Sequence, residues 1–233
     1  MTIRAVIFDR DNTLLQFDQR AIATLESQIT GIAPALPSGA AAQHWITWPG
    51  PWPYTEADEP AFWQLFWSNL AGHYGLSATT AATLQSIGAF YHTCFVAFPD
   101  AANCVSILRA RGFRLAVLTN YELPSISQTL RHAGLDPDLF AALLSSTVIG
   151  VRKPDPRAYL IATGTLGLSP GECAFVDDLL VNVEAARKIG MQGWLLDRKR
   201  MLVANQNERA YTIDSLVALL EQPELNITHR GFA

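Results

Sequence analysis

Charge is what this 233-residue chain has least of. Asp, Glu, Lys and Arg make up 16% of the residues, against roughly 25% in an average soluble domain. Lysine occurs only as Lys153, Lys188 and Lys199, and the formal net charge is −4. A nucleic-acid partner therefore has no electrostatic support, and we expect none.

Cysteine and long apolar runs are also scarce. Cys94, Cys104 and Cys173 are widely spaced, which excludes a disulfide scaffold and suits a reducing compartment. No apolar run approaches the roughly 18 residues of a membrane span, and the N-terminus lacks a signal-peptide cleavage pattern. We expect a cytoplasmic protein with no membrane partner. Disorder is excluded because 49% of the residues are hydrophobic.

The sequence does contain a regular alternation of strand-like and helix-like segments. Near-continuous apolar runs that end in polar residues are typical of parallel strands buried on both faces, and they occur at 3–8, 113–119, 173–176 and 193–196, with a weaker one at 142–145. Helical patterns that stop at a glycine lie between them, at 100–111, 124–133, 156–166 and 180–189. Asp100 is the predicted N-cap of the first. This alternation predicts an α/β fold, a doubly wound parallel sheet in a Rossmann-like three-layer α/β/α core.

Residues 16–97 interrupt that alternation. Helical patterns at 20–30, 60–74 and 78–95 flank a Pro/Gly/Trp-rich linker at 32–53, and no convincing strand is present. We predict an α-helical cap domain at 16–97, inserted into a core formed by 1–15 and 98–233.

Five of the six tryptophans fall in this predicted cap. The spacing of Phe62, Trp63, Phe66 and Trp67 favours helix packing over a ligand site. Trp45, Trp48 and Trp52 lie in the linker, where they line either the cap face toward the site or a dimer contact.

Polar residues follow three of the predicted strands: Asp9 and Asp11, Thr119 and Asn120, and Asp177 and Asp178. Ligands of open α/β sheets bind beyond the carboxyl ends of the strands. Clustered carboxylates repel one another unless a cation intervenes, and an all-oxygen ligand set suits Mg²⁺. Lys153 precedes a helix and is placed to reach the same cleft. A lysine beside carboxylates and a divalent metal indicates a phosphate group to be neutralised.

Four segments, in order, resemble the motifs of the haloacid dehalogenase-like (HAD) hydrolase superfamily. They are DRDNT at 9–13, LAVLTN at 115–120, RKPDP at 152–156 and FVDDLLVNV at 175–183. The resemblance is to the subfamily with a helical cap after the first strand. Two residues depart from the commonest pattern: Asn12 replaces a frequent glycine, and Arg10 stands where a small apolar residue is usual.

The resemblance implies a set of catalytic roles. Asp9 is the expected nucleophile, forming an aspartyl-phosphate, and Asp11 the acid that later acts as a base. The Thr119 hydroxyl and the Asn120 backbone N–H are expected to hold phosphoryl oxygens, and Lys153 to offset their charge.

The resemblance also implies a Mg²⁺ site. The expected ligands are the Asp9 carboxylate, the Asp11 backbone carbonyl and Asp178. Asp177 is expected to act behind them or through water, and Asn182 to orient the loop.

The leading hypothesis is a Mg²⁺-dependent phosphatase acting on a small phosphorylated metabolite, as a monomer or homodimer. A 2-haloacid dehalogenase is an alternative, although a leaving halide needs no proton from Asp11. A phosphomutase and a non-catalytic protein that binds a phosphorylated ligand also remain open. The motifs leave the physiological substrate undetermined.

Overall fold

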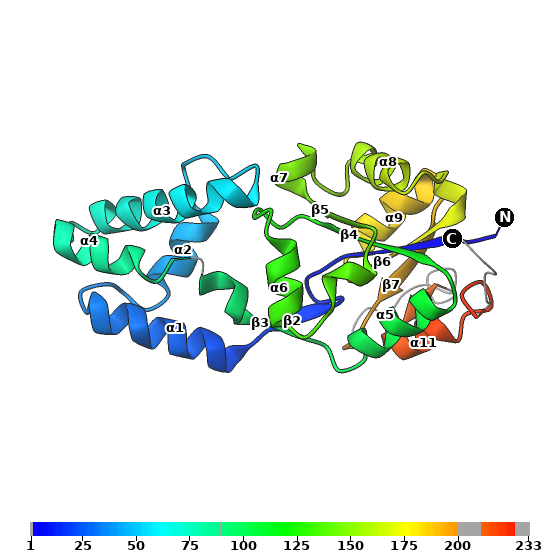
Figure 1. Ribbon diagram of the computed structural model, residues 1–233, viewed down its shortest axis with the longest axis horizontal. Helices are drawn as coiled ribbons and strands as arrows, with labels where there is room; N and C mark the ends of the chain where they lie inside the picture. Colours follow the sequence, from blue (N-terminus) through cyan, green and yellow to red (C-terminus); the bar gives the residue numbers. More distant parts are fainter. Residues whose placement is uncertain (1, 89, 200–210, 227–233) are drawn as a thin grey trace.

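The computed structural model describes residues 2–88, 90–199 and 211–226. Six parallel strands form its main sheet in the order β5-β4-β1-β6-β7-β8 (Figure 1). Their bounds are Ala5–Phe8 (β1), Arg114–Thr119 (β4), Ala142–Ser145 (β5), Cys173–Asp177 (β6), Gln192–Leu196 (β7) and Thr212–Ile213 (β8). Because Phe8 pairs with both Val117 and Val176, the residues that follow these three strands meet at one edge of the sheet.

Helices cover both faces of the sheet. They are α5 (Ala101–Ala110), α6 (Ile126–His132), α7 (Ser146–Ile149), α8 (Pro156–Thr165), α9 (Leu180–Lys188) and α11 (Leu216–Leu220). Side chains of β1 alternate between two apolar clusters, Val6 and Phe8 in one and Ala5 and Ile7 in the other. Since both faces are buried, the strand is apolar throughout. The predicted doubly wound α/β/α core is confirmed.

The five predicted strands are present, and β8 is one that the sequence did not predict. The predicted side-chain cap of α5 is wrong. Asp100 stands at the N-cap position but makes no capping bond. Its carboxylate instead accepts hydrogen bonds from the Leu216 backbone N (2.9 Å) and the Arg198 guanidinium (3.0 Å). These donors, distant in sequence, tie α11 and the segment after β7 to the start of α5.

Two short strands lead out of the core and back into it. Leu15–Phe17 (β2) pairs antiparallel with Phe95–Ala97 (β3), with Phe17 opposite Phe95. The expectation of no strand within 16–97 is therefore wrong, because a three-residue strand is too short to show an alternating pattern.

Four helices lie between β2 and β3: α1 (Gln19–Ile32), α2 (Ala40–Ile46), α3 (Glu59–His73) and α4 (Ala78–Gln85). They gather at one end of the molecule, on the side toward which β1 runs (Figure 1). Helix α2 occupies the segment predicted as a linker. Helix α4 ends ten residues before the predicted end at 95, because the chain turns into a 3₁₀ segment, Phe90–Cys94, and then β3. The predicted core range 98–233 includes 200–210 and 227–233, which lie outside the described residues.

The aromatic stripe of α3 forms the centre of these helices. Phe62, Trp63, Phe66 and Trp67 are all buried in one cluster with Leu70, as the helical spacing predicted. Trp45, Trp48 and Trp52 pack against the same cluster. No helix of the described chain combines the length and apolarity that a bilayer crossing requires.

A buried polar cluster joins the helical insertion to the core. Glu59, the first residue of α3, accepts a hydrogen bond from the Ser125 backbone N (2.9 Å) and lies 3.6 Å from Nε2 of His92. Nδ1 of His92 lies 3.0 Å from the Thr129 hydroxyl. All four residues are buried.

We predict that Glu59→Ala lowers the free energy of unfolding by about 1–3 kcal/mol, because it leaves the buried Ser125 N–H without an acceptor. Glu59→Gln keeps a carbonyl acceptor and is expected to lower the free energy of unfolding by less than Glu59→Ala does. Glu56→Ala, which removes exposed contacts with Ser127 and Gln128, is the control and is expected to change stability by less than about 0.5 kcal/mol. Urea unfolding measures all three, and equal effects at 56 and 59 would contradict the role of burial.

Candidate active site

The site is built around two carboxylates and one lysine. Asp9 follows β1 directly, and its backbone N donates to the Val176 carbonyl (2.8 Å). Nζ of Lys153 lies 2.6 Å from Oδ1 of Asp9 and 2.7 Å from Oδ2 of Asp177. The three side chains are buried. Lys153 therefore bridges the ends of β1 and β6, as its predicted position in the cleft requires.

A third carboxylate completes an acidic cluster. Asp9, Asp177 and Asp178 each offer an oxygen within 4.8 Å of the others. Burial raises the pKa of Asp9, and the neighbouring Asp177 and Asp11 add to this against the opposing effect of Lys153. Burial and the Asp177 charge raise the pKa of Asp178 to about 6. Lys153 contacts two of these three carboxylates, Asp9 and Asp177, so one lysine faces three acidic groups, whose oxygen donors fit a hard divalent cation.

Asp177 is held by its own loop. Its carboxylate accepts hydrogen bonds from the side chain of Asn182 (3.0 and 3.2 Å) and from the Leu179 backbone N (2.8 Å). The backbone carbonyl of Asn182 in turn accepts a hydrogen bond from the Tyr159 hydroxyl (2.9 Å). The structure thus places Asn182 where the sequence expected a residue that orients this loop, and Tyr159 is a further contact that the sequence did not single out.

Asn12 supports the third carboxylate. Its φ of +57° lies in the left-handed region, which Asn adopts more readily than most residues. A side-chain hydrogen bond from Asn12 lowers the pKa of Asp178, against the larger effect of burial. The departure from glycine at this position is therefore compatible with the turn and adds a contact to the cluster.

Thr119 is the last residue of β4, and Asn120, which follows it, lies beside Lys153. The Asn120 side chain exchanges two hydrogen bonds with the backbone of Lys153, at 2.9 and 2.8 Å. The buried Thr119 hydroxyl accepts a bond from the Tyr121 N (3.1 Å). Asn120 thereby fixes the position of the lysine, a role that the sequence did not predict.

The Asp11 carboxylate lies apart from the acidic cluster formed by Asp9, Asp177 and Asp178 among the described residues. Its Oδ1 accepts hydrogen bonds from Nε (3.1 Å) and Nη2 (2.7 Å) of Arg10. The guanidinium of Arg10, only 1% exposed, lies 3.5 Å from the ring centroid of Tyr121 and 4.5 Å from that of Phe95. Arg10 thus orients Asp11 from a buried aromatic setting. In the sequence, the sign that Arg10 has a special role is that it stands where a small apolar residue is usual.

We predict that two substitutions of Arg10 differ in their effect on stability. In Arg10→Met the side chain still fills the space against the Tyr121 and Phe95 rings, so unfolding free energy stays within about 1 kcal/mol of the wild type. Arg10→Ala leaves a cavity and is expected to cost about 2–4 kcal/mol. Both lose the contact that orients Asp11, so activity falls about tenfold or more in each. Denaturant unfolding and steady-state rates test this, and full activity of Arg10→Met would contradict the orienting role.

Comparison with known proteins gives consistent matches. A profile described as haloacid dehalogenase-like hydrolase matches residues 3–190. The chain is 34% identical over 203 residues to "Phosphatase MT3486" of Mycobacterium tuberculosis (strain CDC 1551 / Oshkosh), covering 85% of this chain and 89% of that one. It is 30% identical over 200 residues to (S)-2-haloacid dehalogenase 1 of Pseudomonas sp. (strain CBS-3), covering 84% and 85%. The crystal structure of a 2-haloacid dehalogenase from Pseudomonas syringae pv. Tomato DC3000 is similar in fold, with a TM-score of 0.67, 22% identity and coverage of 94% and 97%.

Proposed function

The chain belongs to the haloacid dehalogenase-like hydrolase family, and we propose that it is a magnesium-dependent phosphatase. Its substrate would be a small phosphomonoester, cleaved through an aspartyl-phosphate on Asp9. The observation that carries the proposal is the imbalance of charge at the site. Three carboxylates cluster there, two of them, Asp9 and Asp177, share the contact with Lys153, and a divalent cation would supply the missing positive charge.

The residues present fit such a cation. Asp9 and Asp178 would hold it together with the Asp11 backbone carbonyl, since all are hard oxygen donors. Asp177 is already bound by Lys153 and Asn182, which suits a residue that supports the ligands from behind. When bound, Mg²⁺ would neutralise the phosphoryl oxygens and so favour their approach to an anionic nucleophile.

The side chains then divide the reaction into two displacements. A carboxylate oxygen of Asp9 forms a bond to phosphorus while the bond to the leaving oxygen breaks, and Asp11 gives its proton to that oxygen. In the second step Asp11 takes a proton from the attacking water, and the bond between phosphorus and Asp9 breaks. Lys153, Thr119 and the Asn120 backbone N–H would stabilise the phosphoryl oxygens.

A metal-free 2-haloacid dehalogenase is the second candidate. The direct contact between Lys153 and Asp9 would stabilise an ionised nucleophile without a metal, and the likeness to a haloacid dehalogenase extends over most of the chain. The excess of carboxylates favours the phosphatase.

Two assays on the same purified protein distinguish these functions. We expect phosphate release from 4-nitrophenyl phosphate with Mg²⁺, its loss with EDTA, and its recovery when Mg²⁺ is restored. We expect no chloride from 2-chloropropionate under either condition. Chloride release that is indifferent to EDTA would replace the phosphatase by the dehalogenase. Failure of both reactions, with Mg²⁺-dependent binding of phosphate, would indicate a non-catalytic protein.

A further inference from the structure

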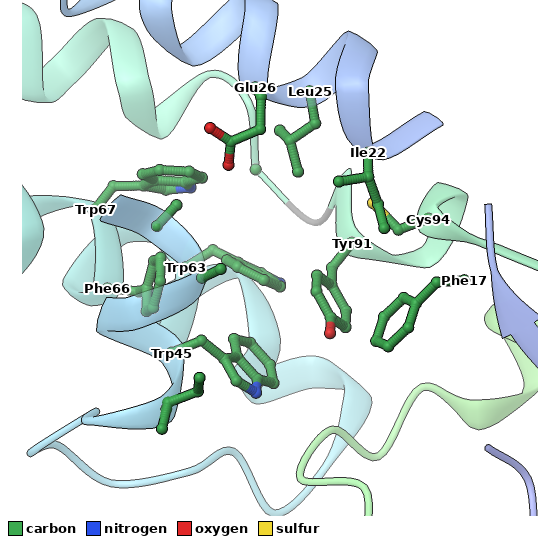
Figure 2. A pocket seen from close by; sticks show the side chains of 14 residues that line it. Phe17, Ile22, Leu25, Glu26, Trp45, Trp63, Phe66, Trp67, Tyr91 and Cys94 are labelled. Carbon is green, nitrogen blue, oxygen red and sulfur yellow. The ribbon is translucent and has the colours of Figure 1, made fainter. Parts of the chain in front are cut away.

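An apolar pocket of about 400 Å³ lies among the helices that follow β2 (Figure 2). Helices α1, α2 and α3 contribute most of its walls. Its volume falls within the range of about 300–1,000 Å³ that is usual for small-molecule sites.

This pocket is separate from the catalytic site. None of the catalytic side chains is among the described residues that line it. Tyr91 in its wall stacks on Tyr121 with centroids 6.1 Å apart, and the guanidinium of Arg10 packs 3.5 Å from the centre of the Tyr121 ring. These side chains fill the space toward Asp11, so a molecule in the pocket does not reach the acidic cluster.

Aromatic rings dominate the lining of the pocket. The aromatic side chains in it are those of Phe17, Trp45, Trp63, Phe66, Trp67 and Tyr91. Figure 2 shows Trp45 and Trp63 on one side and Tyr91 on the other. The face of an aromatic ring carries partial negative charge and attracts a cation placed against it, most strongly in tryptophan. Three tryptophans at one pocket therefore favour a positively charged occupant.

The charge of the lining has the same sign as the ring faces. Glu26 is the one charged side chain among the described residues of the lining, and in Figure 2 its carboxylate points toward Trp67. It accepts a bond from the Gly39 backbone N (3.1 Å), but a carboxylate has about four acceptor positions. No salt bridge between described residues involves Glu26. Its negative charge is therefore available to a ligand.

This lining discriminates among classes of small molecule. No Lys, Arg or His of the described chain lies in it, so an anion would meet ring faces and a carboxylate of its own sign. A sugar would lose its hydration without finding enough polar partners in return. A cation with apolar substituents buries those substituents against the rings, while Glu26 supplies the opposite charge that a buried cation needs.

We propose that this pocket binds an organic cation with apolar substituents, of the quaternary ammonium class. The binding belongs to the helical insertion and requires neither Mg²⁺ nor Asp9, so it stands or falls independently of the proposed phosphatase reaction. An apolar cavity of about 150 Å³ holds a benzene ring, and the larger volume here has room for a ring that carries a trimethylammonium group.

The test compares two probes of the same shape. Phenyltrimethylammonium carries the charge, and tert-butylbenzene has carbon in place of the nitrogen. Because Trp45, Trp63 and Trp67 line the pocket, tryptophan fluorescence of the metal-free protein reports binding. We expect saturable quenching by the cation, a Kd at least tenfold higher for tert-butylbenzene, and no saturable quenching by benzenesulfonate, which is an anion.

Three variants locate the binding. Glu26→Gln keeps an acceptor for the Gly39 N–H and removes the charge, so it should weaken cation binding at least fivefold and leave tert-butylbenzene within twofold. Glu56→Gln removes the same charge from an exposed residue of the insertion outside the lining, and is the control, with both affinities within twofold. Ala41→Trp places a ring in the pocket from α2 and should weaken both probes at least tenfold. Thermal unfolding checks that each variant is folded.

The other outcomes contradict the proposal. Equal affinities for the two probes, or cation binding that Glu26→Gln leaves unchanged, would show that the pocket does not select a positive charge. Cation binding that survives Ala41→Trp would place the cation elsewhere on the protein. Absence of saturable binding by the folded wild type would overturn the site itself.

Discussion

Asp9→Asn is expected to reduce phosphate release by about 10³-fold or more, the scale of losses when a nucleophile is removed. The carboxamide keeps the shape of the side chain and can still accept a bond from Lys153, but it cannot form the acyl-phosphate bond. The substitution is not expected to lower the stability of the folded protein. Burial raises the pKa of Asp9 against the opposing effect of Lys153, with Asp177 and Asp11 adding to the rise, so ionising this carboxyl in the folded state costs free energy that a neutral side chain does not require.

The expected result is therefore loss of activity with a thermal midpoint equal to or above that of the wild type when no metal is added. Asp138→Asn changes an exposed carboxyl of the core and serves as the matched control, with activity and midpoint unchanged. Turnover by Asp9→Asn within tenfold of the wild type would exclude Asp9 as the nucleophile.

Lys153→Met is expected to lower the free energy of unfolding by about 3–5 kcal/mol, the usual cost of removing one partner from a buried ion pair. Lys153 makes the contacts that neutralise Asp9 and Asp177, at 2.6 and 2.7 Å, and methionine leaves both carboxylates buried without it. Activity should fall by about 10²-fold or more, because the same ammonium faces the phosphoryl group in the proposed reaction.

Lys188→Met, at an exposed position on α9, is the control and should change stability by less than about 0.5 kcal/mol. Two further measurements tie the loss to charge. Added Mg²⁺ should recover part of the stability of Lys153→Met, and so should a second substitution, Asp9→Asn, because it removes one of the stranded carboxylates. An unfolding midpoint equal to that of the wild type would show that the two buried contacts contribute nothing.

The core and the acidic cluster could be predicted from the sequence because each leaves a local signal. A strand buried on both faces must be apolar throughout, and parallel strands bring their polar ends to one edge, so Asp9, Asp177 and Asp178 were expected together. The register of β1 with β4 and β6 confirms that expectation for the strand ends.

The features that the sequence did not predict depend on contacts between distant segments. Arg10 is buried only because Tyr121 and Phe95, far along the chain, cover it. Asp100 sits where a cap belongs but binds Arg198 and Leu216 instead. The apolar pocket lined by residues of α1, α2 and α3 depends on how these helices pack together, and the sequence pattern of a single helix does not predict it.

The pairing of β2 with β3 has a consequence for how the chain is assembled. Phe17 and Phe95 lie opposite each other in adjacent antiparallel strands, which is the spacing that an ordinary tight turn spans. For the core, the whole segment 18–94 therefore takes the place of one hairpin loop. Loop-closure entropy grows only slowly with length, so the core can carry insertions of very different size and shape at this point. The β2–β3 pair therefore allows the inserted helices to differ in length and arrangement without a change in the sheet that carries Asp9 and Asp177.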